Sequence, residues 1–192
     1  ITYMFAVPQL YYAMRQAPNY APDKMTSTEP ILYGGAEIDG TFLTQMDREW
    51  AGAVRHIYGT TETMCSLYHA DPVGQHRRLR PGFYSRIRVI RIGGGTNDVV
   101  AVGEEGELIV DAARDAVFTE YLNRPEATKE KVVDGWYYTG DICLLHDNGD
   151  VDLIGRTDDV IRSGGENIHP GDIEAVLAAH PGVMEAAVIG TS

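Results

Sequence analysis

Two short stretches carry the side chains best able to do chemistry. The first is Tyr58–Glu62, which reads YGTTE, and the second is Trp136–Asp141, which reads WYYTGD. An aromatic ring can stack on a base, a hydroxyl can donate to a phosphate oxygen, and a carboxylate can ligate a magnesium ion. A carboxylate such as Asp141 can also accept hydrogen bonds from both hydroxyls of a ribose. Together these groups predict a nucleotide site; the alternative is that they are only polar residues that cap strand ends.

A third stretch, Gly155–Glu174, combines an acidic pair, a Ser-Gly-Gly turn and a His-Pro sequence. Before it, Leu153-Ile154 ends an apparent strand. After it, apolar residues recur at helical spacing: Ile173, Val176 and Leu177. Pro170 suits the first turn of a helix, where its missing N–H costs little. The stretch therefore predicts a strand, a charged joint, a glycine loop able to approach a ligand, and a helix. The alternative is an ordinary β-hairpin followed by a surface helix.

By their order and separation, these three stretches resemble the acid–CoA ligases of the adenylate-forming superfamily, which also includes luciferases and peptide-synthetase adenylation domains. The resemblance covers nearly the whole chain. The run from Ile57 through Arg80-Pro81-Gly82-Phe83 to Ile92–Gly95 is similar to the aryl acid ligases of the 4-chlorobenzoate and benzoate type. The resemblance implies a ligase that uses ATP, Mg²⁺ and coenzyme A to convert a small carboxylic acid, here an aryl acid, into an acyl-AMP and then an acyl-CoA thioester.

The resemblance also implies roles for individual residues. Thr61 and Glu62 would be catalytic, with Thr61 at the α-phosphate and Glu62 as the ligand of Mg²⁺. The nucleotide-binding residues would be Gly34, Gly35, Ala36, Tyr58, Thr61, Asp141 and Arg156. The acid pocket would be lined by Ile57, Gly59, Met64 and Cys65. The hinge between domains would be Asp158, and the coenzyme A channel would be formed by Ser163, Gly164, Gly165 and Glu166.

Two parts of such an enzyme are missing from the chain. The glycine-rich phosphate loop is expected upstream of Ile1, and the lysine that drives adenylation is expected beyond Ser192. The chain also begins within an apparent strand and ends just after the apolar run Ala186–Ile189. We therefore expect an internal fragment of a longer enzyme, inactive by itself.

Composition excludes several other classes. A chain of 192 residues with 44% hydrophobic content can bury a core. Its net charge of −12 argues against nucleic-acid binding, which needs a basic face. Neither the two cysteines, Cys65 and Cys143, nor the six histidines have the spacing of a metal site or disulfide framework. The absence of a long apolar run predicts a cytoplasmic protein with no membrane contact. The resemblance adds the possibility of a homodimer in the full-length form.

The apolar periodicity predicts an α/β fold. Strands and helices are expected to alternate over the first part of the chain: Thr2–Val7, Pro8–Arg15, Ile31–Gly35, a helix reaching Trp50, and Val54–Tyr58. This order is typical of an open, largely parallel sheet, in which ligands bind at the carboxyl ends of the strands. Further strands are expected at Asp98–Val102, Glu107–Asp111, Trp136–Cys143 and Val151–Ile154, with a short helix at Pro125–Lys131 and a turn at Gly93–Gly95.

These elements suggest three units. Residues 1–78 would belong to a parallel-sheet α/β subdomain, 79–157 to a small β-rich subdomain, and 158–192 to the hinge and the start of an α+β C-terminal lid domain. Six arginines between 77 and 91 could form a docking patch for coenzyme A phosphates or only a solvated strand face.

Three functional alternatives stay open. Peptide-synthetase adenylation domains usually carry an Arg-Ile-Glu pattern after the joint, whereas Glu166–Pro170 here resembles the CoA ligases. A luciferase-like oxygenase has no separate signal in this sequence. A non-catalytic AMP-binding module would keep the fold and bind AMP without forming a thioester.

Overall fold

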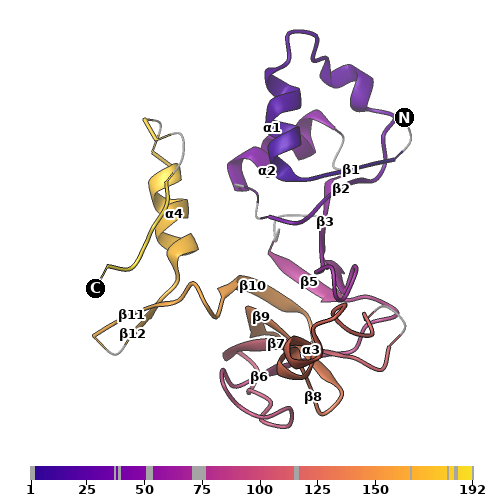
Figure 1. Ribbon diagram of the computed structural model, residues 1–192. Coiled ribbons are helices and arrows are strands. Elements are labelled where there is room, and N and C mark those ends of the chain that lie inside the picture. The colour runs from indigo at the N-terminus through magenta and orange to yellow at the C-terminus, as the bar shows by residue number, and fades with distance from the viewer. Residues whose placement is uncertain are drawn as a thin grey trace.

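The fold is mixed α/β and is built on one long sheet (Figure 1). The computed structural model describes residues 3–36, 38, 40–50, 54–70, 77–114, 117–164, 166–180, 182–183 and 186–191, without the side chains of Thr41 and Glu166. Ten strands form the large sheet, with a path of β1-β2-β3-β4-β5-β10-β9-β7-β6 and with β8 paired to β9. The α/β prediction is confirmed.

The N-terminal part alternates strands and helices, as its apolar periodicity predicts. Its elements are β1 (Met4–Ala6), α1 (Pro8–Gln16), a 3₁₀ turn (Pro22–Met25), β2 (Ile31–Tyr33), α2 (Gly40–Glu49) and β3 (Val54–Tyr58). The three strands run parallel, with Ile31 beside both Met4 and Val54. A buried core fills the space between strands and helices: Ala6, Tyr11, Ile31, Tyr33, Phe42, Leu43, Met46, Trp50 and Val54. Because parallel strands end at the same edge, β2 and β3 deliver Gly34–Ala36 and Tyr58–Glu62 to neighbouring places.

The rest of the large sheet is antiparallel. Its strands are β4 (Leu67–His69), β5 (Arg78–Pro81), β6 (Ile87–Ile90), β7 (Glu105–Asp111), β8 (Val132–Val133), β9 (Trp136–Leu145) and β10 (Val151–Arg156), with α3 (Pro125–Lys131) before β8. Strand β4 pairs with β3, and β5 pairs with β10, so the sheet continues through the predicted boundary at 78/79. That boundary stays a prediction. A second core lies on this sheet: Leu67, Leu79, Val89, Leu108, Cys143 and Val151.

The predicted strand Asp98–Val102 is wrong. Only Val99 makes a ladder contact there, an isolated antiparallel bridge to Ile90. The side chain of Asp98 instead accepts a hydrogen bond from the N–H of Gly95 at 2.8 Å, which closes the predicted glycine turn. A second turn follows at once at Gly103, whose φ of 85° favours glycine, so too few residues lie between the turns to extend a ladder.

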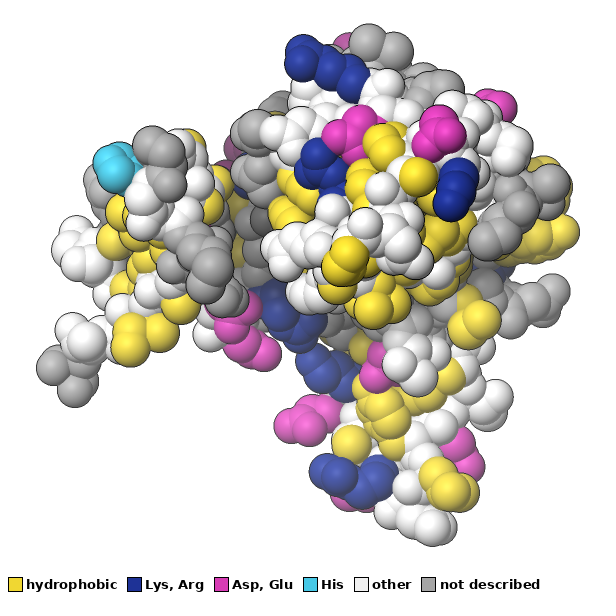
Figure 2. All heavy atoms as spheres, turned by 90° about the horizontal axis from the view of Figure 1, so that it is seen from above, with side chains coloured by type: hydrophobic (Ala, Val, Ile, Leu, Met, Phe, Trp, Pro, Cys, Tyr) yellow, Lys and Arg dark blue, Asp and Glu magenta, His cyan; other side chains and the backbone are white. Residues whose placement is uncertain are grey.

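After β10, residues 157–159 form a turn and the chain leaves the large sheet. It then forms the hairpin β11 (Ile161–Ser163) and β12 (Glu166–Ile168), followed by α4 (Pro170–Ala178). The strand, the turn and the helix were predicted, and a hairpin lies between the turn and the helix; whether the turn acts as a joint stays a prediction. We call residues 160–191 the C-terminal segment; it stands beside the main body in Figures 1 and 2. Within the described residues, no helix is long and apolar enough to cross a membrane.

Candidate active site

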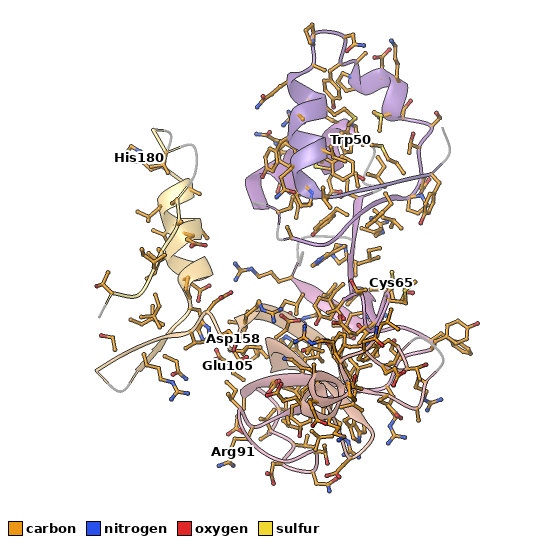
Figure 3. The ribbon with its side chains drawn as sticks, viewed as in Figure 1. Trp50, Cys65, Arg91, Glu105, Asp158 and His180 are labelled. Atoms are coloured by element: carbon orange, nitrogen blue, oxygen red, sulfur yellow. The ribbon has the colours of Figure 1, made fainter. Side chains whose placement is uncertain are left out.

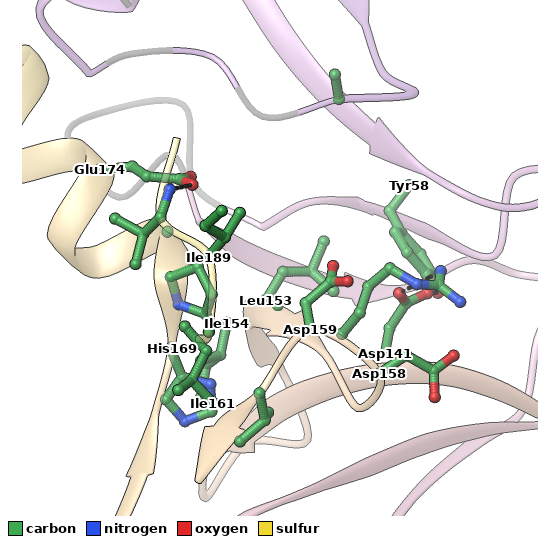
Figure 4. Close-up of a pocket in the computed structure, with 18 of the residues that line it drawn as sticks. Tyr58, Asp141, Leu153, Ile154, Asp158, Asp159, Ile161, His169, Glu174 and Ile189 are labelled. Atoms are coloured by element: carbon green, nitrogen blue, oxygen red, sulfur yellow. Dashed lines mark hydrogen bonds and ion pairs between the residues drawn. The ribbon is translucent and has the colours of Figure 1, made fainter. Parts of the chain in front are cut away.

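A cavity of about 950 Å³ lies between the large sheet and the C-terminal segment (Figure 4). The sheet side contributes Gly35, Ala36, 56–60, Asp141, 153–156, Asp158 and Asp159. The opposite side contributes Val160, Ile161, Arg162, 169–171, Glu174 and 188–191. The cavity thus opens at the carboxyl ends of β2 and β3, where the sequence predicts a ligand.

Asp141 is the central charged group of the sheet side. It lies on β9 opposite Arg156 of β10 and is only 8% exposed. The hydroxyl of Tyr58 donates to its Oδ2, and Nη1 of Arg156 donates to its Oδ1 at 3.0 Å. Tyr58 of β3 and Arg156 of β10 therefore both contact the carboxylate of Asp141 on β9. The nucleotide-site prediction requires such a meeting of these three residues.

Burial controls the electrostatics of this group. Desolvation raises the pKa of Asp141, although the hydrogen bond from Tyr58 and the charge of Arg156 act in the opposite direction. Burial, and then the neighbouring charge of Asp141, raise the pKa of Tyr58 well above its usual range. Tyr58 therefore stays a protonated donor, and the carboxylate at the centre of the cavity wall is costly to keep ionised.

The Thr139-Gly140 sequence turns Asp141 into the cavity. The hydroxyl of Thr139 donates to the carbonyl oxygen of Leu108 at 2.8 Å and accepts from the N–H of Asp141 at 3.0 Å. Gly140 has a φ of 76°, and a Cβ there would lie 3.2 Å from Nη2 of Arg156. A side chain at position 140 would therefore be strained and would crowd the arginine. This explains physically why glycine precedes Asp141.

Glycines allow close backbone approach at both strand ends. A Cβ on Gly34 would collide with the carbonyl oxygen of Ile57 on the neighbouring strand, and one on Gly59 would collide with that of Met64 within the same loop. Gly35, at a φ of 82°, and Ala36 then line the cavity beside Tyr58. These small residues leave room for a flat ring against the backbone.

Thr61 and Glu62 do not line this cavity, whereas Thr60 does. Thr61 is exposed. Glu62 accepts a hydrogen bond from the hydroxyl of Tyr121 at 2.6 Å, and its N–H donates to Oγ1 of Thr60 at 3.2 Å. Burial alone would raise the pKa of Glu62, but the hydrogen bonds from Tyr121 and Thr60 outweigh it and lower the pKa. The carboxylate is therefore anionic and lies just beyond the cavity edge.

Glu62 could hold a metal only with ligands from elsewhere. Within the described ranges, no group of three or more His, Cys, Asp or Glu residues could hold an ion. A single anionic carboxylate is nevertheless suited to a Mg²⁺ ion that arrives with a nucleotide, because such ions take most ligands from phosphates and water.

Only two of the four residues predicted for the acid pocket line the cavity. Ile57 and Gly59 line the cavity, but Met64 is 65% exposed and Cys65 is also exposed (Figure 3). The hinge candidate Asp158 lines the cavity in the turn after β10.

The described part of the predicted coenzyme A channel does not line the cavity. Ser163 and Gly164 are exposed and do not line the cavity, while Gly165 and the side chain of Glu166 lie outside the described residues. The acid-pocket, hinge and channel roles therefore stay predictions.

Four of the six arginines between 77 and 91 make contacts within the sheet. The guanidinium groups of Arg86 and Arg88 lie 5.2 and 4.3 Å from the centre of the Trp136 ring. Arg78 and Arg80 pair with Asp152 and Asp150, each at 3.3 Å. These contacts favour the strand-face interpretation over the docking patch.

Sequence reasoning missed the contribution of the C-terminal segment to the cavity. Ile161, His169, Glu174 and Ile189 all face it (Figure 4). His169 also pairs with Glu105 at 3.3 Å, across the junction to the main body. The His-Pro sequence indicated a helix start but not this pairing. The hydrogen bond from Tyr121 to Glu62 was missed as well.

Comparison with known proteins identifies the family. The model of the family described as AMP-binding enzyme matches residues 1–122. A 4-chlorobenzoate–CoA ligase of Arthrobacter sp. is 43% identical over 190 residues, which is 99% of this chain and 36% of that protein. A feruloyl-CoA synthase of Amycolatopsis sp. is 33% identical over 99% of this chain and 38% of its own length. The chain thus spans little more than a third of the curated relatives that it matches.

Solved structures agree with this assignment. ATP-bound MatB from Rhodopseudomonas palustris superimposes with a TM-score of 0.85 at 28% identity, over 98% of this chain and 37% of that one. The o-succinylbenzoate CoA synthetase MenE of Bacillus subtilis, in complex with its acyl-adenylate intermediate, gives a TM-score of 0.82 at 31% identity, over 100% of this chain and 38% of that one. The family match covers more than half of the residues, and the relatives are similar along nearly the whole chain. This chain therefore belongs to the family of AMP-binding enzymes.

Proposed function

We propose that this chain is part of an ATP-dependent carboxylic acid–CoA ligase. The observation that carries the proposal is the meeting of Tyr58, Asp141 and Arg156 at the wall of one large cavity. The relatives named above are ligases and synthetases that make CoA thioesters, which supports the same function here.

In this proposal, the sheet side of the cavity binds ATP. Gly35, Ala36 and Tyr58 border the adenine, and Asp141 accepts hydrogen bonds from the ribose hydroxyls. Arg156, whose side chain is 47% exposed, can turn from Asp141 toward the same ribose. Thr61 donates to the α-phosphate as the carboxylate of the acid attacks the α-phosphorus, so that pyrophosphate leaves and an acyl-AMP forms.

The proposed metal ligand is Glu62. Its carboxylate is anionic, fixed by Tyr121 and close to the cavity, so its chemistry suits a divalent cation. When bound, Mg²⁺ would offset the negative charge that develops on the phosphates. The contribution of this chain is to hold one carboxylate oxygen where such an ion can bind.

The second half-reaction would need a movement about Asp158. We propose that the three units 1–78, 79–157 and 158–192 are real domains or subdomains, and that the last one rotates about this residue. The rotation would bring the loop 163–166 to the cavity, where the CoA thiol attacks the acyl carbonyl and AMP leaves. The position of Asp158, in a turn between the large sheet and the C-terminal segment, supports this assignment (Figure 3).

The proposed acid is an aryl acid of the chlorobenzoate or benzoate type. The relatives named 4-chlorobenzoate–CoA ligase support this class, and Ile57 and Gly59 would form the part of the acid pocket that this chain supplies. The cytoplasmic location and the homodimer stay predictions, which cell fractionation and sedimentation of the full-length enzyme would test.

A substrate panel tests the function. AMP release by the full-length enzyme is measured with aryl and alkyl acids, each with and without CoA. We expect an aryl acid to give the fastest turnover and CoA to be required for sustained AMP release. Acid-dependent pyrophosphate exchange without any CoA thioester would favour a peptide-synthetase-type adenylation domain. AMP binding without either reaction would favour the non-catalytic module.

A further inference from the structure

A segment remote in sequence holds Glu62 from two sides. The N–H of Phe118 donates to the carbonyl oxygen of Glu62 at 2.7 Å. The hydroxyl of Tyr121 donates to Oε1 of the same residue at 2.6 Å, across 59 positions of sequence. We call residues 118–121 the strap. It fixes both the main chain and the carboxylate of Glu62.

The strap is itself held in place. The N–H of Tyr121 donates to Oγ1 of Thr128 in α3 at 3.0 Å. The ring of Phe118 packs against Tyr121, with centroids 4.7 Å apart, and edge-on against Tyr137 of β9, with centroids 5.6 Å apart. Tyr137 is only 4% exposed. Because aromatic rings packed in this way have little rotational freedom, the hydroxyl of Tyr121 is held toward the carboxylate of Glu62.

The contact pairs a hydroxyl donor with a carboxylate acceptor at the short distance of 2.6 Å. A hydrogen bond between a neutral donor and an ionised acceptor is stronger than one between neutral groups. It also stops the carboxylate from rotating freely.

We propose that Tyr121 is a positioning residue, which holds the Glu62 carboxylate in the orientation that binds the divalent cation accompanying ATP. The inference rests on the proposed function, in which Glu62 ligates that ion, and it adds a residue from outside the nucleotide motifs. Groups that orient a metal ligand usually affect metal affinity by about ten- to a hundredfold. Tyr121 is expected to act in this way without touching substrate.

The test uses the full-length enzyme with Mn²⁺ as the probe. Free Mn²⁺ is measured by electron paramagnetic resonance in the presence of ATP and the absence of acid, so that no turnover is needed. Tyr121→Phe keeps the ring and removes the hydroxyl. We expect it to raise the Kd for Mn²⁺ roughly tenfold. In pyrophosphate exchange, the Mg²⁺ concentration for half-maximal rate should rise by a similar factor, with the rate recovering at high Mg²⁺ and the KM for the acid unchanged.

Tyr138→Phe is the matched control. Tyr138 lies on β9, and its hydroxyl is 3.4 Å from the carbonyl oxygen of Gly94 rather than near Glu62. Its loss should leave Mn²⁺ binding within about twofold of wild type. If Tyr121→Phe fails to fold, Thr128→Val removes the acceptor that holds the Tyr121 backbone. That variant should weaken Mn²⁺ binding in the same direction by a smaller factor.

Glu62→Gln separates the failure of this inference from failure of the proposed function. If Glu62→Gln weakens Mn²⁺ binding while both Tyr121→Phe and Thr128→Val bind the ion as wild type does, the positioning role is overturned and the metal role of Glu62 stands. If Glu62→Gln also leaves binding unchanged, Glu62 is not the ligand and the inference falls with that assignment. Failure of the wild-type enzyme to make a CoA thioester would instead overturn the proposed function.

Discussion

The two walls of the cavity differ in how firmly they are held. On the sheet side, Asp141 and Tyr58 lie on strands paired to neighbours along their length, and a network of hydrogen bonds fixes their side chains. On the opposite side, α4 contains no buried residue. Several of its apolar side chains, with one from the final residues, are 40–78% exposed: Ile173, Val176, Leu177 and Ile189. Figure 2 shows the C-terminal segment, with apolar side chains on its surface, standing beside the main body.

Few contacts between side chains join the two walls. Among the described residues, His169 lies 3.3 Å from Glu105 across the junction, and Arg77 forms an ion pair with Asp172 at 3.5 Å. The second pair is exposed on both sides and contributes little to stability, about 0–1 kcal/mol. In the first pair, the Glu105 side chain is 48% exposed, so solvent weakens that contact as well. A nucleotide would therefore bind to the preformed sheet side of the cavity, whereas the C-terminal segment could move at a small cost in free energy. This difference agrees with the proposed function, in which the C-terminal segment rotates between two successive reactions in one cavity.

The largest effect is expected at the rigid wall. Asp141→Ala removes the acceptor proposed for both ribose hydroxyls. Each hydrogen bond to a charged group contributes about 1.5–3 kcal/mol, so ATP affinity should fall at least tenfold. Isothermal titration of the full-length variant with ATP measures this. Asp152→Ala is the control, because its carboxylate pairs with Arg78 away from the cavity. Equal ATP affinity in Asp141→Ala and wild type would show that the nucleotide binds elsewhere.

The next effect is expected at the connection between the walls. Asp158→Pro fixes φ in the turn after β10 and should hinder rotation of the C-terminal segment. Pyrophosphate exchange, which reports adenylation, should stay within about threefold of wild type, while thioester formation falls by about tenfold or more if rotation is needed. Rapid-quench measurement of each half-reaction gives both rates. Asp147→Pro is the control for proline in a turn away from the junction, because it lies second in the turn that the N–H of Gly149 closes on the carbonyl oxygen of His146. Equal loss of both half-reactions in Asp158→Pro would contradict the hinge assignment.

The contrast between the walls also explains what could be predicted from the sequence. The rigid wall is made of strands whose apolar periodicity is visible. Gly34–Ala36 and Tyr58 lie at strand ends, whereas Asp141 lies within β9 and was recognised from the motif around it. The parallel order of β1, β2 and β3 and the meeting of Tyr58 with Asp141 could therefore be anticipated. Local turn chemistry was harder: Asp98 reads as part of a strand, yet its carboxylate closes the glycine turn.

The missed contacts depend on packing between segments far apart in the chain. Tyr121 lies in an irregular stretch, and no spacing rule connects it with Glu62. The part of the cavity wall formed by Ile161, His169 and Ile189 depends on the orientation of the C-terminal segment, which local periodicity does not encode. Only the three-dimensional arrangement assigns these residues to the site.

A third prediction concerns the stability of the rigid wall. Desolvation raises the folded-state pKa of Asp141 above its ordinary value. The contribution of Asp141 to the free energy of unfolding is therefore most favourable below its unfolded-state pKa. That contribution is lost as the pH rises through the raised folded-state pKa. At neutral pH the ionised group destabilises the fold, and Asp141→Asn should raise the midpoint of thermal unfolding slightly while weakening ATP binding. The advantage should shrink as pH falls through the raised pKa. A lower midpoint for the variant at neutral pH would contradict this sign.

The smallest effect is expected at the C-terminal segment, from the pair between His169 and Glu105. Glu105→Gln removes one charge from a contact whose carboxylate is 48% exposed, so the loss should be about 1 kcal/mol or less. If the segment rotates as proposed, loss of this pair should shift the ratio of the two half-reaction rates by less than about fivefold. Glu126→Gln, which breaks the exposed pair with Lys129 inside α3, should leave that ratio unchanged.

A double-mutant cycle sharpens this last test. If the pair acts as a unit, His169→Asn and Glu105→Gln should each change the ratio by a similar factor, and the double variant should change it no further. Additive effects would mean that the two residues act independently. Because the pair is weak, it can bias the orientation of the C-terminal segment without locking it, as the proposed rotation about Asp158 would require.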